Sequence, residues 1–138
     1  MREIKFKVYD KTEKKIFKLD TAHDTFNFYD GMASYYNLQN GSGGDEYVLL
    51  QNIGIPDRHG VDIYEGDILG IQYENGNDLY VVEWGDMGFL IIRVQRRRNG
   101  KTSECNIIMQ NRGAIQDYSD IIGNIYEHPT LIEDMKQG

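Results

Sequence analysis

The stretch that decides the fold is Gln51–Ile68, which reads QNIGIPDRHGVDIYEGDI. It contains a turn signal at Pro56, a second one at Gly60 and a Tyr-Glu-Gly-Asp step near its end, with apolar residues between them. Turn residues at such short intervals limit each strand to a few residues, and short strands of this kind are typical of small β-barrels. The stretch therefore predicts a mainly β fold.

The residues at the start of the chain predict an N-terminal β-hairpin. Ile4, Phe6 and Val8 alternate with charged residues, a pattern typical of a half-buried strand. After a polar turn at residues 10–14, residues 15–19 return as the partner strand.

The residues after the opening stretch predict a meander. Three apolar strands are joined by glycine turns, at residues 67–73, 79–84 and 89–94. Asn75-Gly76 is the strongest short-range hairpin signal among these turns, and another turn is expected at Asn99-Gly100. Residues 120–126 predict a closing strand, and residues 130–135 a short C-terminal helical turn. The predicted architecture is a small SH3-like barrel or a strongly bent antiparallel sheet, because closure hides strand edges.

We expect one domain over residues 1–138, divided into an N-terminal hairpin and loop region at 1–55, a β-barrel core at 56–127 and a tail at 128–138. Residues 21–45 fit neither the helical nor the strand period, and the glycines at 41–44 favour a flexible loop over a phosphate cradle. The predicted core consists of Ile4, Phe6, Val8, Ile68, Val82, Trp84, Ile92, Ile122 and Ile125.

Three blocks of the chain, residues 2–10, 51–68 and 121–129, resemble the YopX family of phage and prophage proteins in order and spacing. The chain departs from that family's usual pattern in having Tyr9 where Trp is frequent, and Asn52-Ile53 where Tyr-Thr is frequent. The resemblance implies a phage or prophage origin and a β-rich body. It supplies no catalytic residue to carry over.

Composition predicts a folded protein in a reducing compartment. The 138 residues are 40% hydrophobic and include ten tyrosines and five phenylalanines, whereas disordered chains are poor in aromatic residues. Cys105 is the only cysteine, so an internal disulfide is impossible. The first residues show no signal-peptide pattern, and no segment has the roughly 20 apolar residues that span a bilayer. We expect a soluble cytoplasmic domain, in a bacterial host if the chain is phage-encoded, and no membrane partner.

The net charge of −7 is segregated along the sequence. Residues 1–20 carry a net charge of +3. Residues 41–90 hold ten acidic side chains against one basic, and residues 91–112 hold six basic against one acidic. Opposed patches of this kind can steer partners or drive head-to-tail self-association, so a homo-oligomer is expected. The alternative is that these charged patches are solvated faces of neighbouring strands, whose opposite charges neutralise each other within one chain.

The sequence predicts neither a metal site nor a cofactor. His23, His59 and His128 are scattered, and with Cys105 they lack the spacing of zinc ligands. The segment 57–62 has a cation, not an oxygen ligand, in the middle of what would be a calcium loop.

Glu65 and Asp67 are two residues apart, and paired carboxylates can divide acid and base roles. The neighbouring Gly66 favours a plainer interpretation, in which Tyr64-Glu65-Gly66-Asp67 is a structural turn and the Asp accepts backbone N–H bonds. Cys105 has no base near it in sequence. We therefore expect no catalytic residue and no enzyme activity.

The basic run from Arg93 to Lys101 is the one local feature with a plausible ligand. Its cations are Arg93, Arg96, Arg97, Arg98 and Lys101. They could bind nucleic acid, guard the edge of the preceding apolar strand, or contact a partner protein or a second copy. The acidic pI of about 4.9 disfavours nucleic acid. The leading hypothesis is a non-enzymatic protein-interaction module, and the alternative is a nucleic-acid-binding accessory protein that uses this hairpin.

Overall fold

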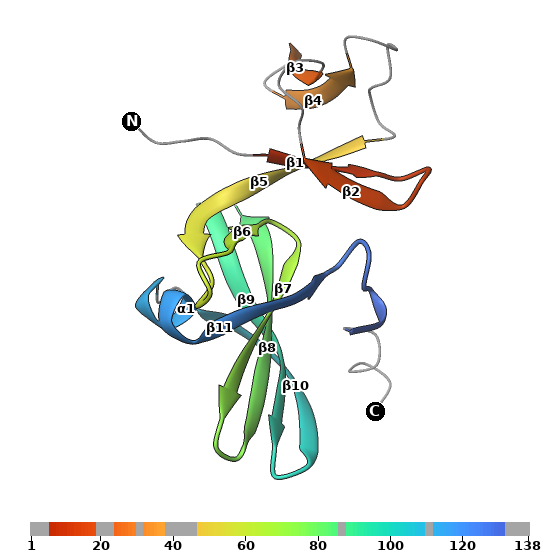
Figure 1. The fold of residues 1–138 in the computed structure, drawn as a ribbon. Helices are drawn as coiled ribbons and strands as arrows, with labels where there is room; N and C mark the ends of the chain where they lie inside the picture. The colour runs from red at the N-terminus through yellow and green to blue at the C-terminus, as the bar shows by residue number, and fades with distance from the viewer. Residues whose placement is uncertain are drawn as a thin grey trace. The chain divides into compact units, whose positions relative to one another are not determined.

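The computed structural model describes residues 6–18, 24–29, 32–37, 47–85, 88–109 and 112–131. The chain forms two compact units, residues 1–52 and 53–138, and strands dominate both (Figure 1). The mainly β prediction is confirmed. The finer domain boundaries that the sequence suggested stay predictions.

The first unit begins with the expected hairpin. Strand β1 (Phe6–Asp10) pairs antiparallel with β2 (Lys15–Lys18). Asp10 shapes the turn between them, because its Oδ1 accepts the backbone N–H groups of Thr12 at 2.9 Å and Glu13 at 3.2 Å. A side chain that binds backbone N–H groups two and three residues ahead stabilises a turn locally.

Strand β5 (Tyr47–Pro56) pairs with the other side of β1, in a sheet of order β2-β1-β5-β6 whose last member is β6 (Asp62–Tyr64). Val8 of β1 lies between Phe17 and Leu49 in the ladder and has no exposed surface. The apolar run at residues 47–50 is only the start of this ten-residue strand.

Residues that the sequence left unassigned form a two-stranded ribbon, β3 (Asp24–Tyr29) and β4 (Met32–Asn37). Adjacent aromatic pairs such as Phe28-Tyr29 and Tyr35-Tyr36 break the alternation by which a strand is recognised. The glycine-rich loop predicted at 40–45 lies outside the described residues.

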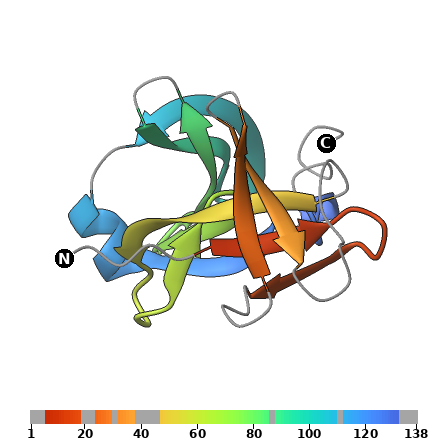
Figure 2. The same ribbon diagram turned by 90° about the horizontal axis from the view of Figure 1, so that it is seen from above.

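The second unit contains a five-stranded antiparallel sheet of order β10-β9-β8-β7-β11. Its strands are β7 (Asp67–Tyr73), β8 (Gly76–Gly85), β9 (Gly88–Arg98), β10 (Lys101–Met109) and β11 (Ser119–Asn124). Figure 2 shows the strong curl of β8, β9 and β10. Positive φ angles at Asn99 (52°) and Gly100 (79°) make the tight turn expected between β9 and β10.

A buried apolar cluster holds the second unit together. Its members are Ile53, Ile55, Ile63, Leu69, Ile71, Tyr80, Val82, Ile91 and Ile115. Fully burying one such side chain contributes about 1.5–3 kcal/mol. The short helix α1 (Arg112–Tyr118), which the sequence analysis missed, supplies Ile115 to this cluster.

The predicted core is largely but not wholly correct. Three residues are buried: Val8, Ile68 and Val82. Three are partly buried: Phe6, Ile92 and Ile125. The prediction is wrong for Ile122, which is 43% exposed, because β11 changes register against β7 between Ile121 and Gly123. Ile4 and the side chain of Trp84 lie outside the described residues.

Gly66 joins segments that are distant in sequence. Its N–H donates to the carbonyl of Val82 at 2.7 Å, and its carbonyl accepts the N–H of Ile125 at 2.8 Å. Its φ of +86° suits glycine, and a Cβ there would lie 2.6 Å from Cε2 of Tyr126. Beyond Tyr126, a helical turn begins at Thr130, and residues 132–138 lie outside the described part of the chain.

Candidate anion-binding face

An irregularity in β9 brings three arginines to one face of the sheet. Arg96 pairs with Asp78 of β8, whereas Arg93 pairs with Tyr80, so that Val94 is an extra residue on β9. Side chains alternate between faces along a regular strand, and residues 93 and 96 would then point in opposite directions. The extra residue reverses the alternation, and Arg93 joins Arg96 and Arg98 on the same face.

Asp78 is the centre of this face. Its carboxylate has no exposed surface, and it forms ion pairs with three guanidinium groups. Oδ1 lies 3.1 Å from Nη2 of Arg98 and 3.2 Å from Nε of Arg96, and Oδ2 lies 3.5 Å from Nη1 of Arg93. A buried carboxylate is costly unless it is paired and hydrogen-bonded, and here both conditions are met.

Two tyrosines complete the cluster. The phenol of Tyr80 donates to Oδ2 of Asp78 at 3.3 Å. Burial raises the pKa of this phenol, so it stays protonated and keeps its role as a donor. The guanidinium of Arg98 lies over the ring of Tyr73, 4.5 Å from its centroid, within the range of a cation–π contact.

The cluster carries surplus positive charge. Three guanidinium groups face one carboxylate, and each guanidinium has five N–H donors whereas the carboxylate has two oxygens. The side chains of Arg93, Arg96 and Arg98 are 12%, 40% and 24% exposed, so the surplus charge reaches solvent mainly at Arg96.

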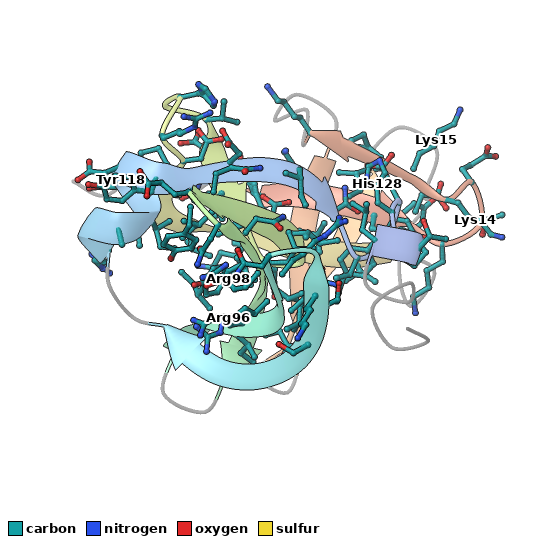
Figure 3. The ribbon with its side chains drawn as sticks, turned by 90° about the horizontal axis from the view of Figure 1, so that it is seen from below. Lys14, Lys15, Arg96, Arg98, Tyr118 and His128 are labelled. Carbon is teal, nitrogen blue, oxygen red and sulfur yellow. The ribbon has the colours of Figure 1, made fainter. Side chains whose placement is uncertain are left out.

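An open cavity of about 410 Å³ lies beside the cluster. Its lining consists of Arg96, Arg98, Asn99, Lys101 and Ser103, so every side chain in it carries a hydrogen-bond donor. The Ser103 hydroxyl donates to the carbonyl of Arg96 at 3.4 Å. Figure 3 shows Arg96 and Arg98 side by side on the concave side of the curled sheet. Arg93, Arg96, Arg98 and Lys101 together form the basic face of the hairpin, and the last three of them line this cavity.

Arg97 belongs to the opposite side of the hairpin. It borders a different hollow of about 440 Å³, together with Gln72, Tyr73, Glu74, Gly76, Asn77 and Gly100. The five cations predicted as one contact surface are thus divided between two faces. Arg93, Arg96, Arg98 and Lys101 lie on one, and Arg97 on the other.

The Tyr64-Glu65-Gly66-Asp67 motif forms the turn between β6 and β7. Oδ2 of Asp67 accepts the backbone N–H of Tyr64 at 2.8 Å, and the Asp67 side chain is buried. With Gly66 held at positive φ, this is the geometry of a turn closed by its own carboxylate.

A third buried carboxylate, Asp57, links the turn after β5 to β11. Its Oδ1 accepts the N–H groups of His59 at 2.9 Å and Val61 at 3.0 Å, and its Oδ2 accepts that of Ile121 at 3.3 Å. The cation within this turn, Arg58, donates outward through Nε to Oδ1 of Asp120 at 2.7 Å. The turn is therefore tied to β11 by two separate carboxylates.

His59 joins the same outward contact, with Nε2 2.6 Å from Oδ1 of Asp120. His128 lies elsewhere, with Nδ1 accepting the N–H of Asn124 at 3.2 Å. No group of three His, Cys, Asp or Glu side chains within the described residues could hold a metal ion. His23 and the side chain of Cys105 lie outside those residues.

Asp78 is the residue of this site that sequence analysis missed. It lies between the Asn75-Gly76 turn and the apolar run at residues 79–82, on the same strand, and this position was the available signal. The pairing of Asp78 with Arg96 could not be predicted from the sequence. A regular register, counted back from the Gly85–Gly88 turn without a bulge, places Gln95 opposite Asp78.

Comparison with known proteins shows which fold and which family the chain shares. A crystal structure of protein EF1440 from Enterococcus faecalis is similar, with a TM-score of 0.59, 23% sequence identity, and coverage of 94% of this chain and 98% of that one. This likeness concerns the fold alone. A search of curated proteins found no match. Within the described residues, no helix is long and apolar enough to cross a membrane. Residues 5–133 match the family described as YopX protein, and the chain therefore belongs to the YopX family.

Proposed function

We propose that this protein is a non-enzymatic interaction module that binds an acidic segment of a partner protein on its basic face. The observation that carries the proposal is the set of three arginines held by the buried Asp78 beside an open, donor-lined cavity. Guanidinium groups are the donors best suited to carboxylate and phosphate oxygens.

The fixed position of the arginines supports a binding role. A free arginine side chain loses roughly 2 kcal/mol of rotamer entropy when it is immobilised. Asp78 already holds Arg96 and Arg98, and Tyr73 adds a stacking contact to Arg98. A ligand would therefore meet donors that are largely ordered before it arrives, which is the general source of affinity in preorganised sites.

The buried carboxylates support a non-enzymatic role. Among the described residues, the buried acidic side chains are Asp57, Asp67 and Asp78. The first two accept backbone N–H groups, and the third binds arginines. Each is committed to a structural contact, whereas a general acid or base needs a proton site that faces a substrate.

A protein partner is preferred over nucleic acid because the positive charge is local. The chain has a net charge of −7, and residues 41–90 carry ten acidic side chains. A long polyanion that extends past the hairpin would meet these charges, whereas a short acidic segment would meet only the basic face within a Debye length of about 8–10 Å.

Affinity capture with charge variants tests the proposal. Lys101→Gln and Arg97→Gln each remove one positive charge from the same hairpin, on opposite faces, and neither residue pairs with Asp78. Wild-type and Arg97→Gln baits should recover the same partner at low salt, and Lys101→Gln should recover much less of it. Equal recovery by both variants, or no partner at low salt, would refute the proposal.

Nucleic acid is the second candidate, favoured by Tyr73, which is 45% exposed at the end of β7, beside the turn of the basic hairpin, and could stack on a base. This alternative predicts steep salt dependence, with the slope falling by about one unit for each arginine removed. Absence of any retardation of single- or double-stranded DNA or RNA at low salt would eliminate it.

The family also supports a proposed setting. We propose that the chain is encoded by a phage or prophage and acts in the host cytoplasm, consistent with its single cysteine. We further propose that it self-associates, with basic residues at 91–112 meeting acidic residues at 41–90 of another copy.

A further inference from the structure

We infer that the cavity lined by Arg96, Arg98, Asn99, Lys101 and Ser103 is a binding site for a phosphate monoester carried by a side chain of the partner protein. This inference rests on the proposed function and narrows it, since it replaces a general acidic segment with a phosphorylated one.

The charge of the site suits a dianion. Arg96, Arg98 and Lys101 line the cavity and contribute three positive charges, and Asp78 behind them offsets at most one of these. A carboxylate carries one negative charge, whereas a phosphorylated side chain carries about 1.5 to 2 at neutral pH. A single phosphate group therefore neutralises more of the positive charge around the cavity than a single carboxylate does.

The donors also outnumber what a carboxylate can use. Besides the guanidinium groups of Arg96 and Arg98, the cavity lining contains the Lys101 ammonium, the Asn99 amide and the Ser103 hydroxyl. A phosphate monoester presents three strong acceptor oxygens in three directions, whereas a carboxylate presents two in one plane. Donors that surround a cavity from several side chains match the tetrahedral group better.

Asp78 acts as a positioning residue. It has no exposed surface and so does not touch a ligand in the cavity, but it fixes both Arg96 and Arg98 through the same oxygen, Oδ1. The two guanidinium groups are thereby held near each other despite their like charge. Without such an anchor, repulsion would drive their side chains apart.

The size of the cavity favours an attached phosphate over a free one. A volume of about 410 Å³ lies in the range of small-molecule sites, roughly 300–1,000 Å³, and exceeds what one phosphate group fills. The remaining space can hold the stem of a modified side chain.

Titration of the whole protein with small anions tests the inference. Inorganic phosphate and phenyl phosphate should bind saturably by calorimetry or backbone NMR, with dissociation constants on the order of millimolar for such small ligands. The perturbed amides should lie at residues 96–103. Acetate at the same concentration should bind at least about tenfold more weakly.

The matched variants give the structural control. Lys101→Gln should weaken phenyl phosphate binding about five- to tenfold, and Arg97→Gln less than about twofold, because only Lys101 lines the cavity. Equal weakening by both variants would mean that binding reflects long-range charge alone, and it would overturn the site. Saturable acetate binding as tight as phosphate binding would overturn the ligand class.

The source of the phosphate is tested with a short phosphoserine peptide, its unphosphorylated form and a 5′-phosphorylated oligonucleotide. Preference for the phosphopeptide supports a protein source, and tighter binding of the oligonucleotide overturns it. If no phosphate compound binds but partner capture still depends on Lys101, this inference fails and the proposed function stands. If phosphate binds but capture is indifferent to Lys101, the proposed function fails, and with it the protein source.

Discussion

At Asp78, one carboxylate without exposed surface supports three arginines that would otherwise repel one another. The residue is costly to bury, and its benefit is the geometry that it imposes on its partners. Such a group is more informative about function than the exposed cations around it. Solvated arginines are common on protein surfaces, whereas a buried carboxylate is uncommon unless it is paired.

Substitution of Asp78 measures this role. Asp78→Ala should lower the free energy of unfolding by about 3–5 kcal/mol, because it removes the buried carboxylate with which three partly buried guanidinium groups are paired. Asp78→Asn keeps the shape and one acceptor, so its loss should be smaller. Urea denaturation of both variants provides the comparison. A loss under about 1 kcal/mol for Asp78→Ala would contradict the assignment of Asp78 as the anchor.

The pair formed by Arg58 and Asp120 gives a pH-dependent prediction. A hydrogen bond from Arg58, assisted by one from His59, lowers the pKa of the Asp120 carboxyl below its usual value of roughly 4. A depressed folded-state pKa adds stability above the unfolded-state pKa, and this stability is lost as the pH falls through the folded-state value.

The stability difference between wild type and Asp120→Asn should therefore be largest near neutral pH and should shrink below about pH 4. This stability difference should be modest and should decrease with salt, since the Arg58 side chain is 49% exposed. Denaturation at several pH values measures it. A difference that grows on acidification would have the wrong sign for this contact.

Among the elements, those set by turns were predictable and those set by packing were not. The Asn99-Gly100 turn places β9 and β10 in order, because both residues adopt the positive φ angles that a tight hairpin needs. The Asn75-Gly76 signal also marks the hairpin of β7 and β8, although Gly76 there is already the first residue of β8 and pairs with Tyr73. Helix α1 has seven residues and one buried side chain, Ile115, so it is too short for a helical period to appear. Its conformation depends on the pocket that receives Ile115.

The basic face shows the same division. Its cations could be read from the sequence, and strand alternation alone separates Arg97 from Arg96 and Arg98. The face on which Arg93 lies could not be predicted, because it depends on the bulge at Val94. No residue type specifies a bulge on its own, and a register shift of one residue exchanges the two faces of a strand.

The turn at Gly66 allows a matched test of packing. Gly60 and Gly66 both have positive φ, but a Cβ at Gly60 would meet nothing within 4 Å, whereas one at Gly66 would lie 2.6 Å from the Tyr126 ring. Alanine at either site should cost about 1–2 kcal/mol for the backbone conformation. Gly66→Ala should cost a further 1–3 kcal/mol or so for the displaced ring. Equal losses in thermal denaturation would show that Tyr126 moves aside without penalty.

For the whole molecule, the charge segregation seen in the sequence is in part resolved within one chain. Asp78 belongs to the acidic segment 41–90, and its three arginines belong to the basic segment 91–112. The remaining acidic side chains greatly outnumber the basic ones over the rest of residues 41–90, so attraction between copies is still expected.

Light scattering across a salt series tests self-association. If the contact is electrostatic, the mass should be that of an oligomer at 0.1 M salt and should approach the monomer mass of 16.0 kDa near 1 M, as the screening length falls from about 10 Å to about 3 Å. A monomer under both conditions would exclude the oligomer, and an oligomer at both would exclude its electrostatic origin.

The extra residue at Val94 also bears on how this surface can diverge among related chains. A relative could keep every residue of the strand and pair it with β8 in a regular register, without the bulge. Arg93 would then point away from Arg96 and Arg98, and Asp78 would lose a partner although no charged residue had been substituted. A relative that lost only the extra residue would keep the three arginines on one face, because they would then occupy alternate positions. The spacing of the arginines and the presence of the bulge therefore have to be compared together, and alignments scored by residue identity would overlook the difference.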